Sequence, residues 1–362
     1  MSEPVAWGLA ERVAVRVAGT EPLARSYHYA SLRPDFEELT AQAEELVYQE
    51  IGLRSLRGPA RAVVVERADW VRANIGSMRR LLRPLTDRLA SGLKGPLAVP
   101  ASTLSGVEVG TMLGWMATRV LGQYDALLFD DPPAGAEADN HEGDVVYFVG
   151  PNVLALEKRF GFPPREFRLW LALHEVTHRV QFTGVPWMQD YFRSLIDSTL
   201  NVAEMDPKRF LEALRRSVEA VRAGRNPLDE GGLVALLAGP EQFATLQKTQ
   251  GLMSLLEGHG DVTMDRAGRD RIPSQARFSA TLHERRNAPQ PAVVKVVQQL
   301  VGLDAKMKQY EAGERFIEAV EAVGGPSLLA RVWDGPELLP TLGEIRDPAS
   351  WIRRVSDLAL AK

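Results

Sequence analysis

Apolar residues recur at intervals of three and four along most of the chain, a spacing that predicts amphipathic helices. In the first third of the sequence the clearest helical segments are 36–50, 70–89 and 107–121. From Pro163 onward the same pattern predicts helices at 164–182, 187–200, 207–223, 228–237, 241–256, 292–301, 305–323 and 349–360. Glycine and proline separate several of these segments, as expected of short connections between packed helices.

Strand-like patterns are confined to two short runs, Asp125–Phe129 and Asp144–Val149. The predicted fold class is therefore mainly α with a small β element. The connection between the two runs, 130–143, is rich in aspartate and glutamate. This composition favours a solvated surface loop over a calcium site, because the spacing of its acidic residues matches no EF-hand loop.

Composition narrows the class of protein. The chain has 362 residues, 43 of them basic and 47 acidic, and its formal net charge of −4 argues against a dedicated nucleic-acid binder. It contains no cysteine, which excludes disulfides, thiolate-bound metals and a thiol nucleophile. No apolar run approaches the roughly 18 residues of a membrane span, and residues 1–20 lack the apolar core of a signal peptide. We therefore expect a cytoplasmic protein that contacts neither nucleic acid nor membrane.

One motif carries chemistry, the H-E-x-x-H sequence of residues 174–178. On a helix, positions i and i+4 are about 40° apart around the axis, so His174 and His178 point to the same side. Two imidazole nitrogens so placed can bind one Zn²⁺. Glu175 lies beside them and could take a proton from a water on the metal without binding the ion.

The helix itself is predicted independently of the motif. It would begin after Pro163, carry apolar residues at spacings of three and four, and end near Gly184. The alternative is two histidines that merely pack on an amphipathic helix. Uncharged residues at positions 176 and 177 and a preceding strand favour the metal site over that alternative.

A catalytic zinc site usually has three protein ligands, so a third is needed. The best candidate segment is 255–261, where Glu257 is expected as the ligand and His259 as the alternative ligand. If the helix 241–256 continues, Asp261 lies on the same face as Glu257 and could accept the free N–H of a ligating histidine. Gly258 and Gly260 would then permit close approach to the His174 helix. The alternative is that they end the helix and turn His259 toward the metal.

The chain resembles the gluzincin branch of zinc metallopeptidases, in which H-E-x-x-H is followed by a helical glutamate and, four residues later, an aspartate. It resembles more closely a family of zincin-like hydrolases of actinobacteria and relatives, often labelled as associated with deazaflavin-cofactor biosynthesis. The resemblance rests on HEVTHRVQF from His174, LLEGHGDVTMD from Leu255, LDAKMKQYEAGERF from Leu303 and LLPTLGEIRDPASWIRRV from Leu338. It implies a zincin-like metallopeptidase fold with an edge strand before the metal helix. Asp144–Val149 could be that edge strand, or an ordinary buried strand.

These observations predict a zinc-dependent hydrolase that acts on a peptide or a small amide. Tyr310, His259, Arg277 and His283 are candidate donors to the oxyanion that forms during hydrolysis. The competing hypothesis is a catalytically silent zincin-fold protein with a structural metal that works by binding partners. The expected organisation is an N-terminal helical lobe (1–124), a metal-binding core (125–270) and a C-terminal helical lobe (271–362), or all three in one compact domain. The sequence leaves the oligomeric state open.

Overall fold

The computed structural model describes residues 4–83, 86–87, 98–124, 144–200, 240–287 and 306–360. The predicted strand 125–129, the acidic loop 130–143 and the predicted helices 207–223, 228–237 and 292–301 lie outside these ranges. Within them the chain is mainly helical with one small sheet of three strands, which confirms the predicted fold class. None of the helices in the described part of the chain combines the length and apolarity needed to cross a membrane.

Contacts within the chain divide it into two compact units. Unit 1 comprises residues 1–184 and 263–286, and unit 2 comprises residues 185–262 and 287–362. The three lobes predicted from the sequence stay a prediction.

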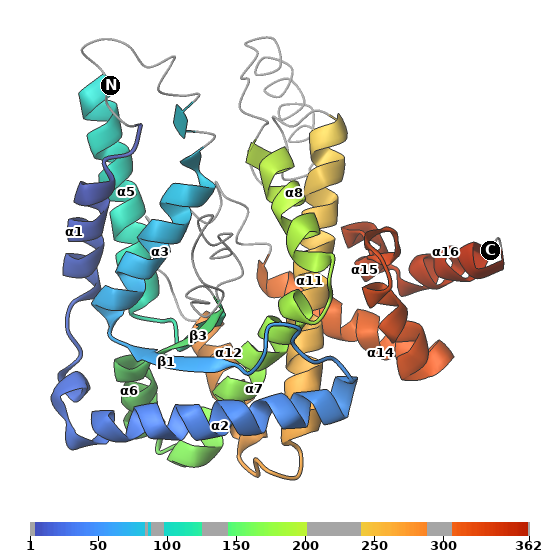
Figure 1. Ribbon diagram of the computed structural model, residues 1–362, viewed down its shortest axis with the longest axis horizontal. Helices are drawn as coiled ribbons and strands as arrows, with labels where there is room; N and C mark the ends of the chain where they lie inside the picture. The colour runs from blue at the N-terminus through green and yellow to red at the C-terminus, as the bar shows by residue number, and fades with distance from the viewer. Residues whose placement is uncertain are drawn as a thin grey trace. The chain divides into compact units, whose positions relative to one another are not determined.

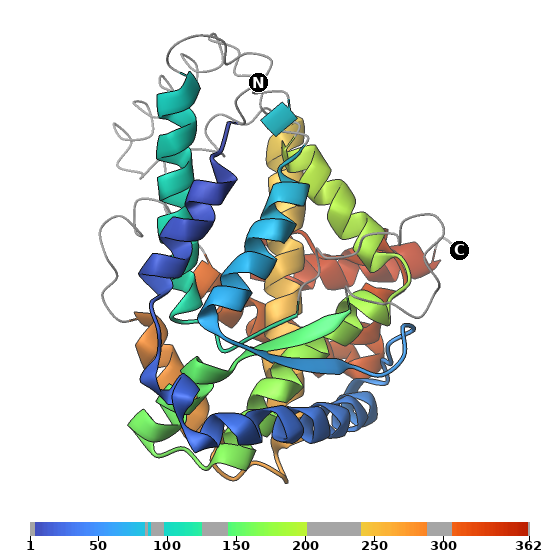
Figure 2. The ribbon, with the colours of Figure 1, turned by 60° about the vertical axis from the view of Figure 1, so that its left-hand side comes forward.

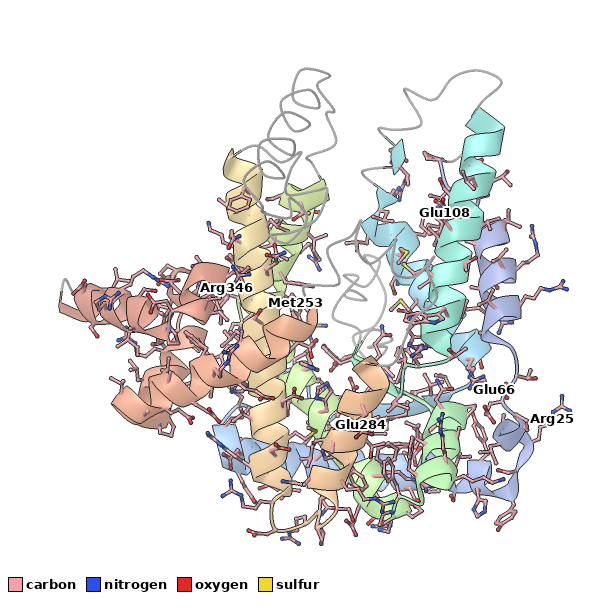
Figure 3. The ribbon with its side chains drawn as sticks, turned by 180° about the vertical axis from the view of Figure 1, so that it is seen from behind. Arg25, Glu66, Glu108, Met253, Glu284 and Arg346 are labelled. Atoms are coloured by element: carbon pink, nitrogen blue, oxygen red, sulfur yellow. The ribbon has the colours of Figure 1, made fainter. Side chains whose placement is uncertain are left out.

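Unit 1 combines the sheet with most of the N-terminal helices (Figure 1). Its elements, in chain order, are α1 (Trp7–Ala18), η1 (Pro22–Arg25), α2 (Tyr27–Ile51), β1 (Arg61–Val65), α3 (Arg67–Leu81), α5 (Ala98–Ala117), β2 (Gly122–Tyr124), β3 (Val145–Val149), α6 (Gly150–Phe160), α7 (Pro164–Thr183) and α12 (Gln275–Asn287). Helices α1, α3 and α5 pack against one another, and α2 packs against β1 and α7 (Figures 1 and 2). The exposed side chain of Arg25 points away from η1 (Figure 3).

The described sheet has the order β1-β3-β2, with β3 parallel to β1 and antiparallel to β2. The predicted strand Asp144–Val149 is thus confirmed as β3. Of the two positions left open for it, the edge is wrong and the buried strand is confirmed, because β3 lies in the middle and four of its five residues are buried. The sequence did not decide between the two positions because β1 and β2, the strands that cover its edges, were not predicted.

The described residues of unit 2 form helices. Its elements are α8 (Met188–Leu200), the greater part of α11 (Pro240–Gly268), α14 (Lys306–Ala330), η3 (Arg331–Trp333), η4 (Pro336–Leu338), α15 (Leu342–Arg346) and α16 (Pro348–Leu360). Helix α14 bends at Gly325, whose φ of 68° suits glycine and which precedes Pro326. The ring of Trp351 on α16 packs against Phe316 of α14, and its Nε1 donates to the Leu338 carbonyl at 2.7 Å.

A capping box fixes the short helix α15 in unit 2. The Thr341 hydroxyl accepts from the Glu344 N–H, and the Glu344 carboxylate accepts from the Thr341 N–H. The same carboxylate pairs with Arg354 at 2.6 Å. Burial raises the pKa of Glu344, but Arg354 and the Thr341 N–H outweigh it and bring the pKa below its usual value.

Candidate metal centre

Helix α7 places His174 and His178 side by side, as the sequence predicts. It begins at Pro164, where proline suits the first turn, and ends before Gly184. Both imidazoles are partly exposed, whereas Leu173 and Val176 beside them are buried. The two ring centroids are 4.6 Å apart and the two Nε2 atoms 3.2 Å apart. The helix therefore presents two imidazole nitrogens at one accessible point.

The separation of these nitrogens suits one small metal ion. Two Zn–N bonds of about 2.05 Å whose nitrogens are 3.2 Å apart enclose an angle of about 100° at the metal. That angle is close to the tetrahedral value that zinc prefers. The spacing of the two nitrogens is thus compatible with both binding the same zinc ion.

Gln181, one turn after His178, fixes the tautomer of that histidine. The Gln181 side chain is fully buried, and its Oε1 lies 3.0 Å from His178 Nδ1. An amide oxygen can only accept, so Nδ1 carries the proton and Nε2 keeps the lone pair that a metal needs. Gln181 was not predicted from the sequence, in which Asp261 was the candidate for fixing the tautomer of a ligand histidine. The signal was available, because a polar residue three positions after a ligand lies on the same helix face.

Glu175 occupies a different environment from the histidines beside it. Its side chain is only 7% exposed, and its Oε2 accepts the backbone N–H of Tyr124 in β2 at 2.9 Å. Gly122 of the same strand also lies against this carboxylate. The glutamate of the motif is therefore held by a strand that the sequence analysis did not identify.

Arg179 fixes α7 to the rest of unit 1. Its guanidinium is fully buried and contacts the carboxylates of Asp144 and Glu44 and the carbonyl of Gly58. These partners come from the start of β3, from α2 and from the segment before β1. Arg179 follows His178 directly, so this network fixes the rotation of α7 around its own axis and with it the direction in which His178 points.

Helix α11 continues without a break from Pro240 to Gly268, through Gly258 and Gly260. Glu257 and Asp261 consequently share one face of α11, whereas the condition that would turn His259 into a ligand, a break at Gly258, is absent. Met253, labelled in Figure 3, lies one turn before Glu257 and marks this part of the helix.

Glu257 on α11 stays the predicted third ligand. Its side chain is partly exposed, as are those of His174 and His178 on α7, so each of the three can offer a ligand atom to a metal ion. His259, by contrast, is 4% exposed and stacks edge-on against Trp333 with ring centroids 5.1 Å apart. Two histidines and one carboxylate are a donor set that zinc accepts.

Gly258 lies against another helix of unit 2. A Cβ on Gly258 would lie 2.4 Å from the carbonyl carbon of Gly313, so the backbones of α11 and α14 touch at these two glycines. The expected approach of Gly258 and Gly260 to the His174 helix stays a prediction, and the C-cap alternative is wrong because the helix continues. The close approach within unit 2 requires glycine on both helices.

The candidate oxyanion donors have varied settings. Arg277 is exposed on α12 and donates to the carbonyls of Gly161 and Phe160. Tyr310 belongs to α14 and His283 to α12, but their side chains lie outside the described part of the structure. The donor for the oxyanion stays a prediction.

A family model for zincin-like metallopeptidases matches residues 5–352, nearly the whole chain. The chain therefore belongs to the zincin-like metallopeptidase family. It is also similar to a protein from Chloroflexus aurantiacus whose crystal structure is described as that of a "putative hydrolase with a novel fold", with 31% identity and a TM-score of 0.71. The similarity covers 97% of this chain and 99% of that one.

No curated protein matches the chain. Family membership and the solved relative support a hydrolase, and the family implies a bound metal, typically zinc. Neither comparison carries the deazaflavin label, which stays a prediction.

Proposed function

We propose that this protein is a zinc-dependent hydrolase that cleaves an amide bond of a peptide or a small amide. In this proposal His174, His178 and Glu257 bind the metal and Glu175 is the general base. The observation that carries it is the geometry of α7, where two imidazole Nε2 atoms lie 3.2 Å apart. The carboxylate between them in sequence is held in place by a backbone N–H.

A bound zinc ion would polarise the substrate carbonyl and make a coordinated water more acidic. The imidazoles of His174 and His178 supply neutral nitrogen donors, and Gln181 keeps the Nε2 lone pair of His178 available. Glu175 takes a proton from the attacking water and delivers it to the leaving amine. Because Glu175 is buried, its carboxylate has little contact with bulk water, and the Tyr124 N–H sets its orientation. Asp261, one turn after Glu257, is proposed to accept a hydrogen bond from a ligand histidine.

The test is Glu175→Gln, which preserves shape but removes the base. We expect zinc content, measured by mass spectrometry, to stay at the wild-type level while turnover of a fluorogenic peptide library falls by about 10²- to 10⁴-fold. Glu318→Gln is the matched control, because Glu318 is an exposed glutamate of α14, and it should leave both quantities unchanged. A chelator should abolish wild-type turnover. Undiminished hydrolysis by Glu175→Gln would contradict the general-base role.

A further inference from the structure

Strand β2 is only three residues long, yet each residue makes a defined contact within unit 1. Successive side chains of a strand point to opposite faces. Gly122 and Tyr124 face α7, where Tyr124 packs against Phe182 with ring centroids 6.3 Å apart. Gln123 faces α3 and contacts its side chains. The strand thus connects α3 to the helix that carries the H-E-x-x-H motif.

Two features of β2 fix the Glu175 carboxylate. The Tyr124 N–H donates to Oε2 at 2.9 Å. A Cβ built on Gly122 would lie 2.6 Å from Oε1 and 2.7 Å from Cγ of Glu175, far inside van der Waals contact. The carboxylate occupies the space that any side chain at position 122 would need, so only glycine allows this position of Glu175.

Helix α3 holds the strand from its other face. Trp70 Nε1 donates to Gln123 Oε1 at 2.7 Å, and Gln123 Nε2 donates to Asn74 Oδ1 at 3.1 Å. Asn74 in turn donates to the Trp70 carbonyl at 2.9 Å, which closes the ring of hydrogen bonds. Trp70 is only 1% exposed. Because these groups are largely buried, each would be costly to leave without a partner, and the strand has little freedom to shift.

We infer that β2 is a positioning element for Glu175, in which Gly122 provides the space, the Tyr124 N–H orients the carboxylate and Gln123 transmits the support of α3. The catalytic consequence rests on the proposed role of Glu175 as general base. The contact itself does not, and it can be tested without any substrate. A base displaced by about 1 Å can lose on the order of 100-fold in rate, so the position of this strand matters directly to turnover.

The first experiment examines the contact by NMR. Labelling with ¹⁵N-tyrosine gives at most seven amide signals, and Tyr124→Phe identifies the one from Tyr124. A backbone N–H that donates to a carboxylate forms a stronger hydrogen bond than one that donates to a neutral amide oxygen, and its proton shift reports that difference. The Tyr124 signal should therefore move in Glu175→Gln and keep its wild-type position in the control Glu318→Gln. A Tyr124 signal at the wild-type position in Glu175→Gln would overturn the inference.

The second experiment compares two glycine-to-alanine changes. Gly122→Ala should lower kcat by about 100-fold with KM and zinc content unchanged, and should also shift the Tyr124 amide signal. Gly76→Ala is the control, since Gly76 lies on α3 with open space around it, and it should change none of these. A raised KM with unchanged kcat would show that β2 serves substrate binding, against the inference. Wild-type protein that hydrolyses nothing but shows the NMR contact would refute the proposed function and leave the positioning contact standing.

Discussion

Arg179→Met tests how firmly α7 is fixed in unit 1. Arg179 has no exposed surface, and its guanidinium bonds to both oxygens of Asp144, to Glu44 at 2.7 Å and to the Gly58 carbonyl at 2.8 Å. Methionine fills much of the same volume but removes every one of these donors. Asp144, 4% exposed, would be left as a buried charge without compensation.

Breaking a buried ion pair by removing one partner costs about 3–5 kcal/mol, mainly because the other charge stays buried. Domains of ordinary stability unfold with about 5–15 kcal/mol, so Arg179→Met should remove a large fraction of the stability of unit 1. Adding Asp144→Asn removes the uncompensated charge. The double variant should therefore be more stable than Arg179→Met alone, with a coupling energy of about 0.5–3 kcal/mol.

Urea unfolding followed by far-UV circular dichroism measures these differences. Arg33→Met is the matched control, because Arg33 forms an ion pair with Glu37 on the surface of α2 with 81% of its side chain exposed, and surface pairs contribute little. Its midpoint should stay at the wild-type value. A loss of less than about 1 kcal/mol in Arg179→Met, or a double variant less stable than Arg179→Met, would show that the network does not fix α7 as argued.

Three further outcomes are expected. Gln181→Leu should weaken zinc binding by about 10- to 100-fold in competition with a chelator, because His178 loses the acceptor that fixes its tautomer, and unchanged affinity would contradict this. Gly258→Ala should lower the urea midpoint, because overpacking against Gly313 costs about 1–3 kcal/mol and exceeds the gain in helix propensity; a variant at least as stable as wild type would contradict the close approach. The pKa of Glu344 is lower in the folded protein than in the unfolded chain, so its ionised carboxylate stabilises the fold above the unfolded-state pKa, and this stabilisation is lost as the pH falls through the folded-state pKa. Between about pH 5 and pH 3, Glu344→Gln should therefore lose less stability than the wild type in urea unfolding.

The elements that the sequence predicted well are those with local signals. Helix α7 has apolar residues at helical spacing, proline at its start and glycine after its end, so both its bounds and the common side of His174 and His178 followed from the sequence. The sequence left open whether the predicted helix 241–256 continues past Gly258, since Gly258 and Gly260 disfavour a helix interior. Tertiary packing outweighs that cost, because only glycine at 258 allows the backbone of α14 to come so near.

Strands β1 and β2 were missed for a physical reason. The three residues of β2 are too few to show periodicity, and both strands pair with a strand distant in sequence, from which a strand gains most of its stability. Without them, the sequence left open whether β3 lies at an edge or in the middle of the sheet. The same limit applied to the partner of Glu175, since Tyr124 precedes it by 51 residues and contributes only a backbone N–H.

The metal ligands could be predicted from the sequence, whereas the contacts that hold the proposed general base could not. Ligand chemistry requires particular side chains at a particular spacing, and His174 and His178 satisfy that requirement within a single helical turn. The support of Glu175 requires only a backbone N–H and the absence of a side chain at position 122. Neither requirement can be recognised from the residue types in the sequence. Gly122 looks like an ordinary turn glycine until the fold brings it against the carboxylate. Substitutions at such backbone positions should therefore lower the rate without removing a metal ligand, whereas substitutions of His174 or His178 should lower both the rate and metal binding.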